Sequence, residues 1–264
     1  MDQYRNSILG VARYEAIDSL GTMFTDEDGV GNLIGVALND DFWAIRELAL
    51  MKIAENPERM KVIFPDLEDR LFELAENDPK NTVRLGAIEL LSALDPDKYS
   101  PAFLRWMNHP SYYVAGAALG AYLENPENLN REDIASRFEG EKNIRLLVAL
   151  ADYYISENIS GRSDWFNEKL EMLGGQSLYY FLGYYGDYFT KNEKEDKESA
   201  IQNLSRIASQ HQANYVRIAA FMGLFGFIDE PGVLEKVKKI YEEERNDLAK
   251  KYQEFFLSSY QEEN

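Results

Sequence analysis

The feature that most constrains the fold is a helix signal that recurs along the chain. Its clearest copy lies at 78–91, where Asp78 suits a helix cap, Pro79 suits the first helical position, and apolar residues follow at the spacing of one helix face. The core of this copy is an arginine followed three residues later by an alanine, Arg84 and Ala87. The pattern predicts an amphipathic helix that packs one apolar face against its neighbours.

The same core returns at intervals of 30 to 38 residues. The clear copies carry their arginine at Arg13, Arg46, Arg84, Arg145 and Arg217. Two degenerate copies, at Ala115 and Tyr179, fill the gaps between them. Such a period with two helices per unit is the signature of an α-solenoid, because one helix pair cannot bury its apolar face without neighbours. We therefore expect an all-α superhelix of about seven helix pairs, forming a single domain over residues 1–264.

The ends of the array and the breaks within it follow from local signals. The first helix is predicted over Ile8–Phe24, and Asn56-Pro57 and Asn125-Pro126 end later helices in the same manner. A long polar helix from Pro231 to about Ser258 is expected to close the stack, with 229–264 serving as cap and tail. No segment has the pattern of a β-strand.

The repeat arginines have two possible roles. Taken singly, each is a candidate ligand for an anion. Because the five recur in phase with the repeat, we expect them to bridge to the acidic turns of adjacent units, which is a structural role.

One predicted helix, Ser177–Phe189, carries more aromatic surface than a single buried stripe requires. Part of this set must face the neighbouring helices, whereas the rest can lie on the concave surface and bind peptide side chains. The candidate contacts for a peptide or partner are Tyr180, Tyr184, Tyr185 and Tyr188.

No catalytic or metal-binding motif is found. The chain has no cysteine, which excludes disulfides, thiol nucleophiles and thiolate metal sites. A zinc peptidase helix needs two histidines one turn apart with a glutamate between them, but His109 and His211 are far apart and each is predicted to lie in a turn. We assign no catalytic residue, no metal ligand and no cofactor to this chain.

The charge balance bears on the partners. The formal net charge is −18, with 46 acidic residues against 28 basic ones and no basic patch, which argues against nucleic acid and acidic membrane surfaces as partners. No apolar run approaches the roughly 20 residues that a membrane helix needs, and residues 1–20 do not have the form of a signal peptide. The cellular compartment is left open.

At this point the residues carry a family likeness. The helix pairs with Asp78-Pro79-x-x-x-Val83-Arg84-x-x-Ala87 resemble HEAT repeats over nearly the whole chain. More narrowly, an ordered set of four segments resembles the C-terminal HEAT-like domain of bacterial zinc aminopeptidases of the aminopeptidase N family. The segments are Arg13–Ile17, Asp41–Arg46, Val83–Ile88 and Val216–Ala220.

The resemblance implies a role rather than a reaction. In that family an upstream catalytic domain carries the zinc motif and the exopeptidase motif, and this chain contains neither. The chain is then a noncatalytic domain that covers the catalytic cleft and restricts peptide access, with the upstream domain as its partner, the zinc held there, and the peptide substrate contacted indirectly. The alternative is a free-standing HEAT scaffold that binds a protein partner on its concave face. A DNA-repair enzyme built of HEAT-like repeats needs a basic groove, against which the charge weighs.

Overall fold

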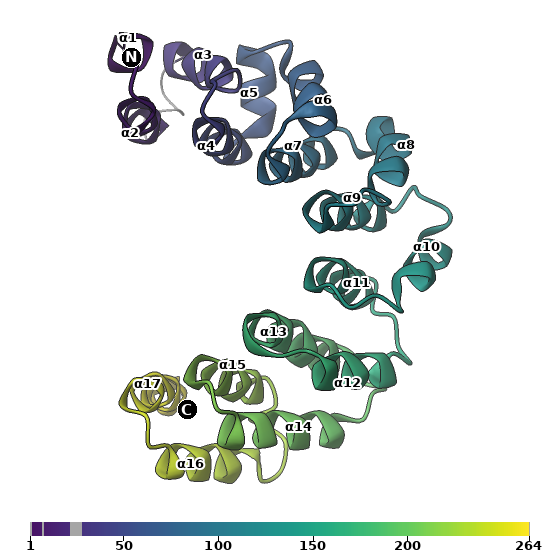
Figure 1. Cartoon of the computed structure of the whole chain (residues 1–264). Coiled ribbons are helices and arrows are strands. Elements are labelled where there is room, and N and C mark those ends of the chain that lie inside the picture. Colours follow the sequence, from purple (N-terminus) through teal and green to yellow (C-terminus); the bar gives the residue numbers. More distant parts are fainter. Residues whose placement is uncertain (1, 7, 22–27, 264) are drawn as a thin grey trace. The chain divides into compact units, whose positions relative to one another are not determined.

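The computed structural model describes residues 2–6, 8–21 and 28–263. Within these residues the chain forms 17 helices and no strand, which confirms the all-α solenoid class (Figure 1). The helices group into two compact units, Met1–Ala135 and Ser136–Asn264. Each unit is described by itself, and the expectation of one domain over residues 1–264 stays a prediction.

The first unit contains the following helices: α1 (Asp2–Asn6), α2 (Gly10–Gly21), α3 (Asp28–Ala37), α4 (Trp43–Ala54), α5 (Pro57–Ile63), α6 (Leu67–Asn77), α7 (Asn81–Leu94), α8 (Pro96–Trp106) and α9 (Tyr112–Glu124). The boundary between the units falls within α10 (Arg131–Phe138). The second unit contains α11 (Ile144–Ser156), α12 (Ser163–Met172), α13 (Gly175–Lys191), α14 (Lys197–Gln210), α15 (Asn214–Phe225), α16 (Val233–Glu243) and α17 (Asp247–Glu263).

Each unit has two layers of helices (Figure 1). In the first unit, α2, α4, α7 and α9 pack side by side in that order. In the second unit, α11, α13, α15 and α17 do the same, while α12, α14 and α16 cover their other side. We call α11, α13, α15 and α17 the inner layer of the second unit. Stacking each pair on the next buries an apolar face that no single pair can bury.

Local capping explains where several helices begin. Asn56 accepts the backbone N–H of Arg59 at 3.2 Å, and Pro57 occupies the first position of α5. Asp95 and Pro96 start α8 in the same way. The helix of the clearest repeat copy begins later than expected, at Asn81, because Asp78 lies in the preceding turn and accepts the N–H of Lys80 at 2.8 Å.

The expectation of one long capping helix is wrong, because residues 244–246 interrupt it between α16 and α17. The side chain of Glu244 accepts the backbone N–H groups of Arg245 and Asn246, each at 2.9 Å. These bonds hold a turn where a helix would otherwise continue. The chain therefore ends on a further helix pair built like the others.

The first helix expected from the sequence corresponds to α2, which begins at Gly10 rather than Ile8 and ends at Gly21, and the short helix α1 precedes it. The rest of the predicted Ile8–Phe24 segment after Gly21, including Phe24, lies outside the described residues. Among the described residues, no helix combines the length and the apolar character needed to cross a membrane.

A candidate protein-interaction surface

Five turns, those before α4, α7, α9, α15 and α17, share one hydrogen bond. In each of the five, a side chain accepts the backbone N–H of the residue two positions later, as Asp40 does with Phe42 at 2.9 Å. The accepting residues are Asp40, Asp78, His109, His211 and Glu244. Both histidines thus lie in turns, and neither is placed as a metal ligand. This bond fixes where the next helix begins.

The repeat arginines join one such turn to the next. Arg46 donates to the carboxylate of Asp78 through Nε at 2.7 Å and Nη2 at 2.9 Å, and both residues are 7% exposed. Its Nη1 donates to the backbone carbonyls of Asp40 and Asp41. The same two-point geometry joins Arg13 to Asp40 and Arg217 to Glu244. The guanidinium groups of these three arginines are engaged in contacts between turns, so they do not form a binding site for an anion.

The electrostatics of these links favour ionised carboxylates. Burial alone raises the pKa of the Asp40 carboxyl, but hydrogen bonds from Arg13 and from the Phe42 N–H outweigh it, so the pKa lies below its usual value. The pKa of Glu244 is lowered in the same way, with burial opposed by Arg217.

The link at Arg84 differs, because its turn carries a histidine. Arg84 Nε donates to the carbonyl of Ala75 at 2.8 Å, and its Nη1 lies 3.1 Å from Nε2 of His109. The other ring nitrogen of His109 accepts the N–H of Ser111 at 3.0 Å. A neutral imidazole has only one acceptor nitrogen, so it cannot satisfy both donors at once. Burial and the charge of Arg84 lower the pKa of His109.

Arg145 is not in the register that the sequence suggested. Equivalent positions can be found from the first backbone bonds of each helix. In α4 the N–H of Arg46 donates to the carbonyl of Phe42, the residue just before the helix. In α11 the equivalent residue is Leu147, whose N–H donates to the carbonyl of Asn143, and Leu147 is fully buried. Arg145 lies two residues earlier, at the start of the helix, where the Asn143 side chain accepts its backbone N–H. At this position the arginine is exposed. The series of buried arginine links is therefore interrupted at α11.

Two of the four candidate tyrosines are core residues. Tyr185 and Tyr188 are fully buried, so the expectation that they contact a partner is wrong for both. The Tyr185 hydroxyl donates to Asn167 at 2.7 Å, and burial raises the pKa of Tyr185 to about 12. Tyr184 is half-buried, whereas Tyr180 is 53% exposed. A helix with aromatics on all sides must bury some of them, and here these two face the neighbouring helices.

Tyr188 is the centre of a polar and aromatic cluster. Its ring stacks on Phe166 with centroids 4.1 Å apart, and its hydroxyl donates to Glu195 at 2.8 Å while accepting the N–H of Arg162 at 2.8 Å. Glu195 also accepts from Ser163 Oγ and from the N–H of Gly161. Burial alone raises the pKa of Glu195, but these donors bring it below its usual value.

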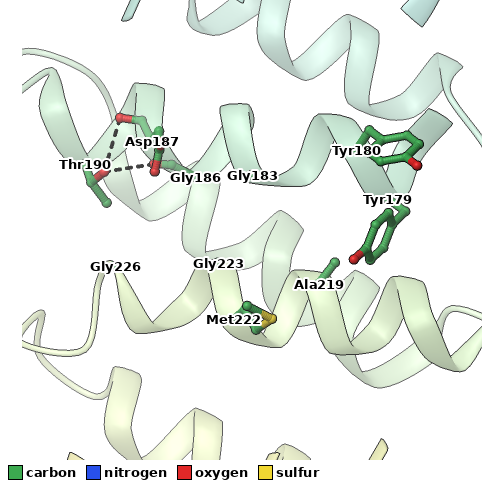
Figure 2. A pocket seen from close by; sticks show the side chains of 10 residues that line it. All are labelled: Tyr179, Tyr180, Gly183, Gly186, Asp187, Thr190, Ala219, Met222, Gly223 and Gly226. Atoms are coloured by element: carbon green, nitrogen blue, oxygen red, sulfur yellow. Dashed lines mark hydrogen bonds between the residues drawn. The ribbon is translucent and has the colours of Figure 1, made fainter. Parts of the chain in front are cut away.

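Tyr180 borders a groove between α13 and α15 with a volume of about 430 Å³ (Figure 2). The two helices approach closely at the base, where a Cβ on Gly186 would lie 3.6 Å from the Cα of Gly223. At Gly183 a Cβ would meet nothing within 4 Å, so this part of the floor is open. In Figure 2, Tyr179 and Tyr180 lie at one end of the groove and Asp187 at the other.

Exposed apolar side chains continue from this groove along the inner layer. Tyr179 lies in ring contact with Tyr180 at 5.4 Å and with Tyr215 at 5.8 Å. The exposed set, which we call the apolar strip, consists of Tyr179, Tyr180, Tyr215, Met222, Leu248, Tyr252 and Phe255. Sequence reasoning found only Tyr180 of this set. The sequence does carry a signal for the strip, because Met222 in α15 and Phe255 in α17 occupy equivalent positions in two neighbouring inner helices.

No group of three or more histidine, cysteine, aspartate or glutamate side chains is placed to hold a metal ion in the part of the chain that the structure describes.

The architecture defines the class as a helical repeat scaffold. In agreement, residues 31–123 match the family model described as HEAT repeats. Searches of curated proteins and of solved structures gave no match. Nothing in these comparisons links the chain to aminopeptidase N.

Proposed function

We propose that the chain is a scaffold that binds a protein partner across the inner layer of its second unit. The observation that carries this proposal is the apolar strip, whose side chains are exposed on three consecutive helices, α13, α15 and α17. Scattered single apolar residues are normal on a protein surface, whereas a continuing set on one face marks an interaction site. Repeat proteins present binding surfaces of this kind.

The composition of the strip also supports a protein partner. Five of its seven members are tyrosine or phenylalanine, contributed by α13, α15 and α17, and Met222 lies among them. Aromatic residues and methionine are enriched in protein interfaces. Phe255 is 64% exposed, and covering one such ring contributes on the order of 1 to 2 kcal/mol.

The expected role as a noncatalytic domain over the cleft of a zinc aminopeptidase lacks support in the comparisons. The scaffold alternative accounts directly for the HEAT repeat match. We therefore propose neither an upstream zinc domain nor a peptide substrate for this chain.

The test compares the full chain with two variants by affinity capture and mass spectrometry. In the first, Tyr180, Met222 and Phe255 are changed to serine; in the matched control, Val62 and Leu129, which are 80% and 97% exposed in the first unit, are changed to serine. We expect partner proteins that the wild type and the control retain to be depleted about tenfold or more by the first variant, with unchanged circular dichroism. Equal retention by all three proteins would contradict the proposal.

A further inference from the structure

We propose that the groove between α13 and α15 takes a linear segment of a protein partner in which an apolar side chain and a lysine or arginine lie two or three positions apart. The apolar side chain sits over Gly183, between Tyr180 and Met222, and the basic side chain pairs with Asp187. This inference rests on the proposed function and specifies the chemistry of the partner.

The apolar end of the groove has room and walls. Because nothing lies within 4 Å of the position that a Cβ would occupy at Gly183, a partner side chain can descend to the helix backbone there. Tyr180 and Met222 are 53% and 46% exposed and border this space from α13 and α15 (Figure 2). A leucine, methionine or phenylalanine would cover apolar surface on both sides, which is the main source of affinity at such a site.

The other end of the groove is acidic. Asp187 is exposed and is the one charged residue among those that line the groove. Its neighbour Thr190 directs its hydroxyl to the backbone carbonyls of Gly186 and Asp187, each at 3.1 Å, and so leaves the carboxylate available (Figure 2). Burial and then the charges of Asp152 and Asp187 raise the pKa of Tyr184, the neighbour of Tyr185 on α13. This end favours a cation and repels an anion.

The spacing within the segment follows from helix geometry. Gly183 and Asp187 are four residues apart on α13, or roughly 6 Å at 1.5 Å per residue. An extended peptide advances about 3.3 Å per residue, so the two peptide side chains lie about two positions apart, or three when a long lysine reaches back.

The apolar strip favours a polypeptide over a small molecule. Beyond the groove, exposed rings continue at Tyr215 on α15 and at Phe255 on α17. A ligand confined to the groove would leave them uncovered. A chain segment that enters the groove with one side chain can cover the others with its flanks.

The probe is a phage-displayed library of random dodecapeptides, selected on the immobilised full chain. We expect the enriched peptides to share an apolar residue and a lysine or arginine two or three positions away. The Kd of a synthetic enriched peptide is then measured by isothermal titration calorimetry against the wild type and three variants.

The first two variants change the groove. Asp187→Lys is expected to weaken binding about tenfold or more, and exchanging the basic residue of the peptide for glutamate should restore it. Gly183→Leu fills the open floor and should also weaken binding about tenfold or more. Since replacing glycine within a helix favours the helix, that loss cannot be assigned to unfolding. Asp66→Lys, which makes the same charge change at an exposed site in the first unit, should leave Kd unaltered.

Four results would overturn the inference. Enriched peptides without a basic residue, or equal Kd values for wild type and Asp187→Lys, would contradict the pairing of a basic side chain with Asp187. Neither result would affect the partner-capture test of the proposed function. The absence of any enriched peptide would contradict the proposal that the groove binds a linear segment. Sedimentation velocity that shows a dimer of wild type and a monomer of Gly183→Leu would assign the groove to a second copy of this chain.

Discussion

Consecutive repeats are joined by different chemistry in the two units. In the first unit, α2, α4 and α7 each contribute an arginine to the next turn, as Arg46 does to Asp78. At the corresponding places early in the second unit, Leu147 is buried instead, and the aromatic stack of Phe166 on Tyr188 fills the core. Repeat stacking therefore does not depend on one type of contact. The glycine-floored groove lies between α13, which contains Tyr188, and α15.

The largest expected effect breaks a link of the first unit. Asp78→Ala leaves the guanidinium of Arg46 buried without its carboxylate, which should lower the free energy of unfolding by about 3–5 kcal/mol in urea denaturation. The double variant Arg46→Met/Asp78→Ala removes the stranded charge and should lose less than the single one. A double variant that loses as much as the sum of both single changes would show that no pairing energy exists.

A smaller change tests the aromatic link of the second unit. Tyr188→Phe keeps the stack on Phe166 but removes the hydroxyl, which takes away one donor to Glu195 and one acceptor of the Arg162 N–H. We expect a loss of about 1–3 kcal/mol in the free energy of unfolding. Tyr180→Phe is the control, because its exposed hydroxyl should contribute little. Equal effects of the two changes would mean that the buried hydroxyl is not part of the link.

A third change should stabilise the protein. Gln253 is fully buried, and neither Oε1 nor Nε2 has a hydrogen-bond partner. In the repeat register its position matches Ala49, Ala87 and Ala220, which lie in the apolar core. Gln253→Met keeps the length and removes the unsatisfied groups, so the free energy of unfolding should rise by about 1–2 kcal/mol. A lower denaturation midpoint would show that the amide has partners in solution.

The smallest effect sharpens the comparison within the first unit. His109→Asp gives Arg84 and the Ser111 N–H the carboxylate acceptor that the other turns provide, and it should raise the free energy of unfolding by about 0.5–1.5 kcal/mol near neutral pH. His109→Asn is the matched control, since an amide is a neutral acceptor. Asn and Asp variants of equal stability would rule out a contribution from charge.

The pH dependence has a defined sign. In the folded protein the pKa of His109 lies below its usual value of 6.5, so at lower pH the unfolded chain binds a proton that the folded chain does not. Wild-type stability should therefore fall as the pH drops through about 6.5, and in His109→Asp this part of the fall should vanish. Denaturation midpoints between about pH 7.5 and pH 5.5 measure it; parallel profiles would contradict it.

The fold followed from local sequence signals to a large extent. Amphipathic periodicity and breaks such as Asn56-Pro57 act within a few residues, and they predicted helices and their pairing. The turn at Glu244 was missed, because Glu242-Glu243-Glu244 fits a helix face and its role depends on Arg217, 27 residues earlier. Arg145 was assigned to the repeat because it is an arginine at roughly the right interval. The backbone hydrogen bonds instead place Leu147 at the position that Arg46 occupies in α4.

The candidate site was harder to predict. Which tyrosines of α13 are buried depends on the helices packed against it, so Tyr180 and Tyr188 could not be separated by spacing alone. The groove exists because two helices meet at Gly186 and Gly223, a tertiary contact that neither helix encodes by itself. Besides Tyr180, the sequence displayed one further part of the strip, the recurrence of the Met222 position at Phe255.

The arginine links also have a mechanical consequence. Arg46 and Asp78 are 32 residues apart, and Arg13 and Asp40 are 27 apart, so each link closes a loop about one repeat long. Under a pulling force, rupture of one link would free that loop and lengthen the chain by up to roughly 100 Å at about 3.4 Å per residue. A load on the first unit is thus released in repeat-sized steps, each held until its own guanidinium–carboxylate pair separates.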